Sequence, residues 1–116
     1  MAEPVYKVLS ETAFKEAERK GHFTGSADDS RDGFIHLSTA HQLDGTLAAH
    51  FAGQAGLILL AVDPSRFGPA LKWERSRGGA LFPHLYAPLD LGAVLWTKKL
   101  TLGEDGRYVL PEGVLA

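Results

Sequence analysis

An unbroken apolar run, Leu57–Val62, constrains the fold of this chain more than any other segment. The run has the length of a strand, and its lack of polar alternation predicts a strand that is buried on both faces. Such a strand needs neighbouring strands in a sheet and apolar cover on each side. The run is far too short to span a bilayer, and we expect no membrane partner.

The N-terminal segment predicts a strand followed by a helix. Residues 5–9 are rich in strand-forming side chains. Ser10 offers a hydroxyl that can cap a helix, and the helix is expected to extend to about Lys20. Gly21 then provides the left-handed position at which such a helix ends.

A second helix is expected between the first strand and the apolar run. Thr39 and Gln42 have the spacing of a capping box, which predicts that the helix starts there. Gly45 weakens this helix, so its first turns are expected to be irregular. Residues 25–33 are polar and predict a loop, which leads into a short strand at residues 34–37.

The segments after the apolar run predict strands alone. Short strands are expected at residues 71–74 and 93–100, and Asp105 with Gly106 predicts the turn of a hairpin that continues into residues 107–110. The total is about six strands and two helices. This pattern predicts an α+β fold in which helices cover a mixed or mostly antiparallel sheet.

Composition is consistent with one domain over residues 1–116. The net charge of −2 gives no strong nucleic-acid signal. The chain has no cysteine, which excludes disulfides, thiolate metal ligands and cysteine nucleophiles. No signal peptide is predicted, because no basic segment with a following apolar run opens the chain. We therefore expect a cytoplasmic protein, and the sequence leaves its oligomeric state open.

Residues 73–86 combine cations, glycines and aromatic side chains in a way that a plain core strand does not require. Glycines let backbone amides approach a ligand, and guanidinium groups are bidentate donors to phosphate or carboxylate. An ordinary hairpin turn explains the glycines equally well, and the spacing matches neither the Walker loop nor the dinucleotide fingerprint. This stretch supplies eight candidate ligand-binding residues: Trp73, Arg75, Ser76, Arg77, Gly78, Gly79, His84 and Tyr86.

Glu74 and His36 each allow two interpretations. Glu74 can shape the loop through an ion pair with Arg75 or Arg77, or it can hold a ligand hydroxyl. His36 shares a strand face with Phe34 and Ser38. Its imidazole can be a core group bonded to a backbone carbonyl, a donor to a ligand, or a general base.

No metal site is predicted, because His41 and His50 do not form a close helical pair. The spacing of Asp28, Asp29 and Asp32 does not fit a calcium loop, so these residues are interpreted as turn formers and caps. A serine-histidine-aspartate triad is not predicted either, since the chain has no nucleophile-elbow motif.

Several of these segments in combination resemble the bacterial domain of unknown function 952 family. The resemblance covers about residues 4–101. Its motifs are Gly25 with Ser26, and residues 32–38, 51–53, 60–63, 73–79 and 82–86. The resemblance implies a split, bent sheet similar to that of ADP-ribosyltransferases and of RNA 2′-phosphotransferases that use NAD. In those enzymes the sheet clasps NAD, and a strand histidine contacts the ribose on the nicotinamide side.

The resemblance implies roles for the candidate residues and NAD as the candidate cofactor. His36 and Ser38 would lie on the nicotinamide side, while Arg75, Arg77 and His84 would hold phosphates. Many transferases of this fold carry a glutamate on a late strand, but residues 96–102 contain no carboxylate. Glu74 is the available substitute, so His36 and Glu74 are the candidate catalytic residues.

Two functions remain open from the sequence. The first is an NAD-dependent ADP-ribosyl- or phosphotransferase. The second is a non-catalytic module that binds a small anionic ligand, such as a nucleotide or a sugar phosphate, or a peptide tail. Whether the chain is an enzyme is not decided by its residues.

Overall fold

The structure, a computed structural model, describes residues 3–114. The apolar run forms β4 (Leu57–Val62), the middle strand of an antiparallel sheet in which β1 (Val5–Ser10) and β8 (Val94–Lys99) occupy its two edges. All residues of β4 are buried. The prediction of a central strand covered on both faces is confirmed.

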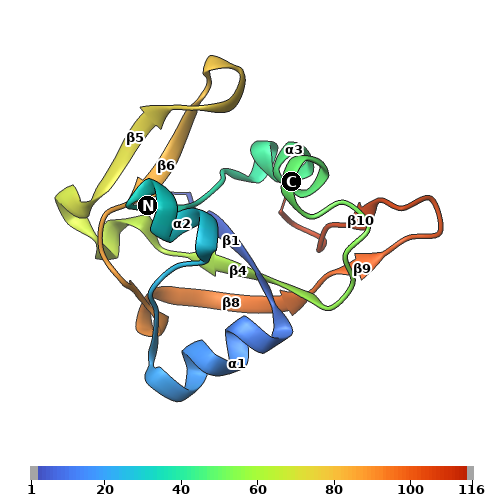
Figure 1. Ribbon diagram of the computed structural model, residues 1–116, viewed down its shortest axis with the longest axis horizontal. Coiled ribbons are helices and arrows are strands. Elements are labelled where there is room, and N and C mark those ends of the chain that lie inside the picture. The colour runs from blue at the N-terminus through green and yellow to red at the C-terminus, as the bar shows by residue number, and fades with distance from the viewer. Residues whose placement is uncertain (1–2, 115–116) are drawn as a thin grey trace.

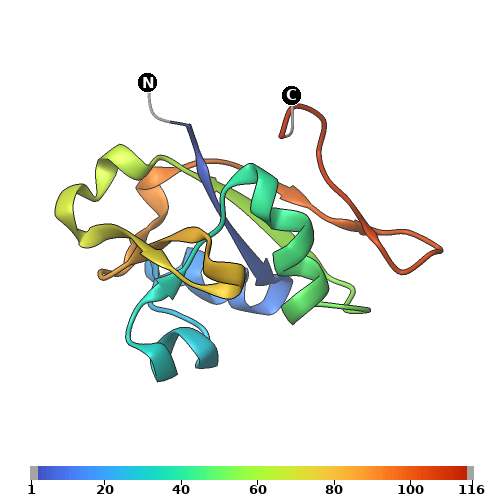
Figure 2. The ribbon, with the colours of Figure 1, turned by 90° about the horizontal axis from the view of Figure 1, so that it is seen from above.

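Alternate residues of β4 belong to two hydrophobic cores on opposite faces of this sheet. Ile58 and Leu60 pack in the core that contains α1 (Glu11–Lys20), and Leu57 and Leu59 pack in the core that contains α3 (Leu43–His50). Figure 1 shows the two helices on opposite sides of the β1–β4–β8 sheet, and Figure 2 shows the same arrangement from above.

The other strands form separate small sheets. The largest has the order β3–β6–β5 and is antiparallel throughout. The two remaining sheets are antiparallel pairs, β2 with β7 and β9 with β10. The bounds are β2 His22–Phe23, β3 Ile35–His36, β5 Leu71–Arg75, β6 Leu81–Leu85, β7 Leu89–Asp90, β9 Thr101–Leu102 and β10 Tyr108–Val109.

The α+β class and the predicted strand regions are confirmed, but the predicted sheet of about six strands is wrong, because the strands form several smaller sheets. Both edges of β4 are occupied by β1 and β8, so the β5–β6 hairpin has no free edge of β4 to join. The β3–β6–β5 sheet meets the first sheet through one bridge, in which Tyr6 and Ser38 exchange backbone hydrogen bonds of 2.7 and 2.9 Å. In Figure 1 the hairpin accordingly stands apart from the β1–β4–β8 sheet.

The predicted caps of the first helix are confirmed. The Ala13 backbone N–H donates to the Ser10 hydroxyl at 3.1 Å, and Gly21 ends α1 with φ of 84°. The Thr39–Gln42 capping box is also present, but it belongs to a 3-10 turn, and α3 itself begins at Leu43. Among the described residues, 3-10 turns are formed by Ala40–Gln42, Pro64–Arg66, Gly68–Ala70, Arg77–Gly79 and Leu91–Ala93.

The prediction of a loop over residues 25–33 is wrong, because this segment contains α2 (Ala27–Asp32). Ser26 and Asp29 form a complete capping box at its start, and Gly33 ends it in the left-handed conformation with φ of 84°. A helix of six residues is too short to be stable in isolation. Asp29 is buried, and its contacts with other elements hold α2 in place.

Within residues 3–114, no helix has the combination of length and apolar content that crossing a membrane requires.

Candidate functional site

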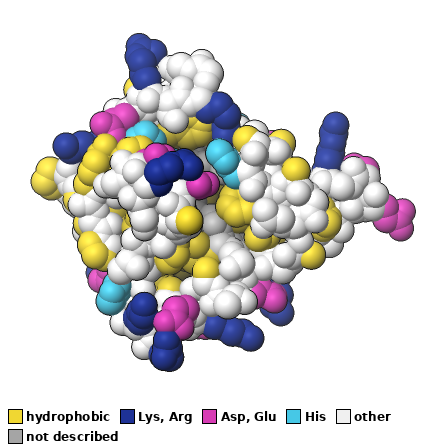
Figure 3. Space-filling view, in the orientation of Figure 1, with side chains coloured by type: hydrophobic (Ala, Val, Ile, Leu, Met, Phe, Trp, Pro, Cys, Tyr) yellow, Lys and Arg dark blue, Asp and Glu magenta, His cyan; other side chains and the backbone are white. Residues whose placement is uncertain are grey.

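A cavity of about 400 Å³ opens beside the outer edge of β1. One wall is α2 with Asp28 and Asp32, the opposite wall is α3 with Thr46 and His50, and the β5–β6 hairpin closes a third side. Charged side chains and imidazoles gather over the gap between α2 and α3 in the space-filling view (Figure 3). The size is typical of small-molecule sites.

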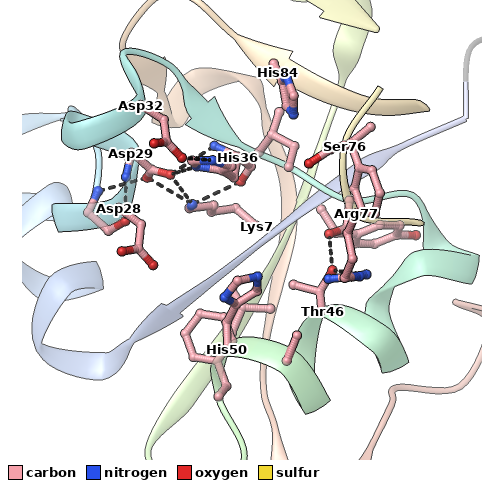
Figure 4. Close-up of a pocket in the computed structure, with 18 of the residues that line it drawn as sticks. Lys7, Asp28, Asp29, Asp32, His36, Thr46, His50, Ser76, Arg77 and His84 are labelled. Atoms are coloured by element: carbon pink, nitrogen blue, oxygen red, sulfur yellow. Dashed lines mark hydrogen bonds and ion pairs between the residues drawn. The ribbon is translucent and has the colours of Figure 1, made fainter. Parts of the chain in front are cut away.

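A buried ion pair forms the floor of this cavity. Lys7 of β1 is 7% exposed and Asp29 of α2 is 3% exposed. Lys7 Nζ donates to Asp29 Oδ1 at 3.2 Å and to Oδ2 at 3.0 Å, and it also donates to the carbonyl oxygen of His36 at 3.0 Å. The pair connects residues that are distant in the chain and fixes α2 against β1 (Figure 4).

The His36 ring is held between two carboxylates. Its Nδ1 lies 2.6 Å from Asp29 Oδ1, its Nε2 lies 2.9 Å from Asp32 Oδ2, and its backbone N–H donates to Asp29 Oδ1 at 3.0 Å. A neutral imidazole donates from one nitrogen only. The two ring nitrogens can therefore donate to both carboxylates at once only when the ring carries two protons.

These contacts determine the charge of Asp29. Burial by itself would raise the pKa of Asp29, but hydrogen bonds from the His36 ring and backbone, the Lys7 charge and the Ser26 N–H lower this pKa far below its usual value. Burial lowers the pKa of Lys7, and Asp29 opposes that shift. Asp29 thus stays ionised at neutral pH as the acceptor of the network.

The lowered pKa of Asp29 predicts a loss of stability in acid. A group whose folded-state pKa is depressed contributes stability above its unfolded pKa of about 4, and the contribution is lost as the pH falls further. We expect the free energy of unfolding to fall below about pH 4, with Asp29 contributing up to about 1.4 kcal/mol per pH unit. Urea unfolding at several pH values between about 6 and 2 should show that the free energy of unfolding depends less on pH in Asp29→Asn than in the wild type. Equal slopes would contradict the prediction.

A second polar group lies on the β5–β6 hairpin. His84 Nδ1 is 2.9 Å from Glu74 Oε1, and the Tyr86 hydroxyl donates to the same oxygen at 2.6 Å. Phe34 stacks on the His84 ring with centroids 4.0 Å apart. Hydrogen bonds from Tyr86 and His84 lower the pKa of Glu74, and the bond to Glu74 raises the pKa of Tyr86.

The two arginines of the hairpin loop have different positions. Arg77 lines the cavity, with its guanidinium 5.0 Å from the centre of the Phe82 ring and its Nη2 3.4 Å from the Thr46 hydroxyl. Arg75 instead donates to the carbonyl oxygen of Gly79 at 3.0 Å. Gly78 and Gly79 have φ of 69° and 80° and form the turn of the hairpin.

The structure brings five of the predicted site residues together in the cavity: His36, Ser38, Ser76, Arg77 and His84. Glu74 does not line the cavity but bonds His84, which does, and Tyr86 donates to the same Glu74 oxygen. Trp73 is 48% exposed and lines a different hollow, beside Pro4 and Leu71. Arg75, Gly78 and Gly79 do not line the cavity.

Sequence reasoning missed Lys7, Asp29 and Asp32 as members of the site. The available signal was a single lysine within the apolar strand at residues 5–9, which suggests a buried cation that needs a carboxylate. The missed residues on α3 are Thr46, which bonds the Ser38 hydroxyl at 2.8 Å, and His50. No pattern in the sequence distinguishes them from surface residues of a helix.

The chain is similar to the protein CC0527 from Caulobacter crescentus. Its X-ray crystal structure is 47% identical in sequence, with a TM-score of 0.92 over 97% of this chain and 99% of that chain. The solution NMR structure of CC0527 is 50% identical over 90% of each chain, with a TM-score of 0.81. A comparison with curated proteins gives no match. Residues 8–97 match the DUF952 family, which is described as a protein of unknown function, and the chain therefore belongs to that family.

Proposed function

We propose that the cavity binds a nucleotide that carries phosphates and sugar hydroxyls, with NAD and ADP-ribose as the first candidates. The proposal combines the geometry of the cavity with the fold similarity to ADP-ribosyltransferases and NAD-using phosphotransferases that the family resemblance implies. We assign the phosphates to the α3 side and the sugar to the α2 side.

The position of Arg77 is the observation that carries this proposal. Its guanidinium lines the cavity. Within residues 3–114, the Arg77 side chain makes one hydrogen bond, a long one to the Thr46 hydroxyl. Several of its donors therefore remain for a ligand, and arginine is the residue best suited to bidentate contact with phosphate. Ser76, in the same hairpin loop as Arg77, also lines the cavity, and its hydroxyl is a further donor.

The α2 side of the cavity suits a sugar. Asp28 and Asp32 present exposed carboxylates there, and a carboxylate accepts hydrogen bonds from hydroxyl groups. His36 is fixed by Asp29 and Asp32, so this wall is pre-organised. A ligand that spans both sides would place phosphates at Arg77 and ribose hydroxyls near α2.

A binding module without a reaction is the second candidate. It is favoured by the absence of a carboxylate from β8 and from residues 96–102, where the resemblance implies a catalytic glutamate. Such a module would retain the phosphate contacts and release no product.

Thermal unfolding with added ligands tests the binding proposal. A ligand at 100 times its dissociation constant stabilises the folded state by about 2.7 kcal/mol, so NAD or ADP-ribose should raise the melting temperature. Adenosine, which shares the base and ribose but has no phosphate, should raise it much less. No shift with NAD, ADP-ribose or nucleoside phosphates at millimolar concentration would overturn the proposal. Release of nicotinamide would distinguish an enzyme from a module.

A further inference from the structure

We propose that His84 is the general base of this cavity and that Glu74 is a positioning residue that holds its ring. The inference rests on the proposed function, because it requires NAD in the cavity. It assigns the proton-accepting role to the histidine of β6 and gives Glu74 a role behind that histidine.

Glu74 fixes the tautomer of His84. The carboxylate accepts hydrogen bonds and does not donate, so the 2.9 Å contact requires the proton on Nδ1. In the neutral ring Nε2 then carries the lone pair, as a general base requires. The Tyr86 hydroxyl donates to the same Glu74 oxygen and holds it in place at 2.6 Å.

The second ring nitrogen of His84 is accessible and has no hydrogen-bond partner among residues 3–114. Within residues 3–114, every fully buried side-chain nitrogen or oxygen has a hydrogen-bond partner. Glu74 is bonded to Nδ1, and no described residue is bonded to Nε2. Nε2 therefore reaches accessible surface, although His84 as a whole is only 4% exposed. His84 lines the cavity, and Phe34 covers one face of the His84 ring.

His36 is less suited to this role, although its ring lies 5.8 Å from that of His84. Asp29 Oδ1 and Asp32 Oδ2 lie 2.6 and 2.9 Å from its two nitrogens, so neither nitrogen of His36 is open to a ligand in the cavity. Figure 4 shows this difference, with His36 inside the network of dashed lines and His84 above it. His36 instead supports the α2 wall.

The reaction that this geometry supports is attack of water, or of another hydroxyl, on C1′ of the ribose that bears nicotinamide. A bond forms between the attacking oxygen and C1′, and the C1′–N bond breaks. Its electron pair goes to the nicotinamide nitrogen, which becomes neutral. His84 Nε2 takes the proton of the attacking hydroxyl and later releases it to solvent. With water the products are ADP-ribose, nicotinamide and one proton.

The test measures NAD binding and nicotinamide release in parallel for the wild type, His84→Gln and Glu74→Gln. We expect His84→Gln to slow release by at least about a hundredfold, since general bases contribute about 10²–10⁴-fold. Glu74→Gln should slow release about tenfold or more with the same dissociation constant for NAD. Nitrogen NMR should show the Nδ1-protonated His84 tautomer in the wild type and a mixture of tautomers in Glu74→Gln. His41→Gln, an exposed histidine outside the cavity, is the matched control and should behave as the wild type.

The outcomes separate the two proposals. Binding of NAD without nicotinamide release, or unchanged release by His84→Gln, overturns the base role and leaves the binding proposal standing. Failure of the wild type to bind NAD overturns the proposed function and the base role together. Because His84 is buried, circular dichroism must show that its variant is folded. Glu74→Gln changes a more exposed side chain and gives an independent result if His84→Gln does not fold.

Discussion

Replacing Asp29 with alanine is expected to lower the free energy of unfolding by about 3 to 5 kcal/mol, the usual cost of breaking a buried ion pair by removing one partner. The change leaves the Lys7 ammonium buried without its carboxylate. It also removes the acceptor of the Ser26 and His36 backbone N–H groups, and with it the capping box of α2. Urea unfolding at pH 7 measures the loss directly.

Two further variants make this experiment specific. Asp28→Ala changes an exposed aspartate in the same turn of α2, whose ion pair with Arg31 lies at the surface. Its loss should be much smaller, because exposed pairs contribute little. The double variant Lys7→Met/Asp29→Ala should be more stable than Asp29→Ala alone, because it removes the unpaired buried cation. A loss below about 1 kcal/mol in Asp29→Ala would show that the network does not hold α2 to β1.

The parts of the fold that could be predicted depend on local signals. Leu57–Val62 has no polar residue, and a strand with that pattern has to be central. Ser10 and Gly21 delimit α1 because a side-chain cap and a left-handed stop act within one turn of the backbone.

The division into several sheets depends on long-range pairing that composition does not reveal. β1 and β8 fill both edges of β4, although they come from opposite ends of the chain. The helix α2 was missed for a related reason. Its segment is mostly polar, and its stability comes from the contact of Asp29 with Lys7, 22 residues away.

Part of the candidate site could be predicted, because alternate residues of a strand place their side chains on the same face. His36 and His84 are direct cross-strand partners in the register of β3 and β6, which explains why two separate motifs meet. Glu74 reaches His84 diagonally, because its direct partner in the register is Phe82. The sequence does not show which arginine of the hairpin loop turns toward α3. That depends on the turn at Gly78 and Gly79 and on the distance to Thr46, neither of which has a local signature.

Arg77→Gln is expected to weaken the binding of NAD and ADP-ribose by about tenfold to a hundredfold. A hydrogen bond to a charged group contributes about 1.5–3 kcal/mol, and each 1.4 kcal/mol corresponds to a factor of ten in the dissociation constant. Glutamine keeps a polar side chain, although a shorter one, and removes the positive charge and the guanidinium fork. Isothermal titration calorimetry with ADP-ribose measures the change without interference from turnover.

Arg75→Gln is the matched control, because it removes the same charge from the same hairpin. Arg75 donates to the Gly79 carbonyl and does not line the cavity. If phosphate is recognised by a guanidinium inside the cavity, Arg77→Gln should weaken binding far more than Arg75→Gln. If the hairpin attracts phosphate only through its overall charge, the two variants should lose affinity equally, and added salt should weaken both. Equal losses would therefore reject Arg77 as the phosphate contact, even if NAD binds the wild type.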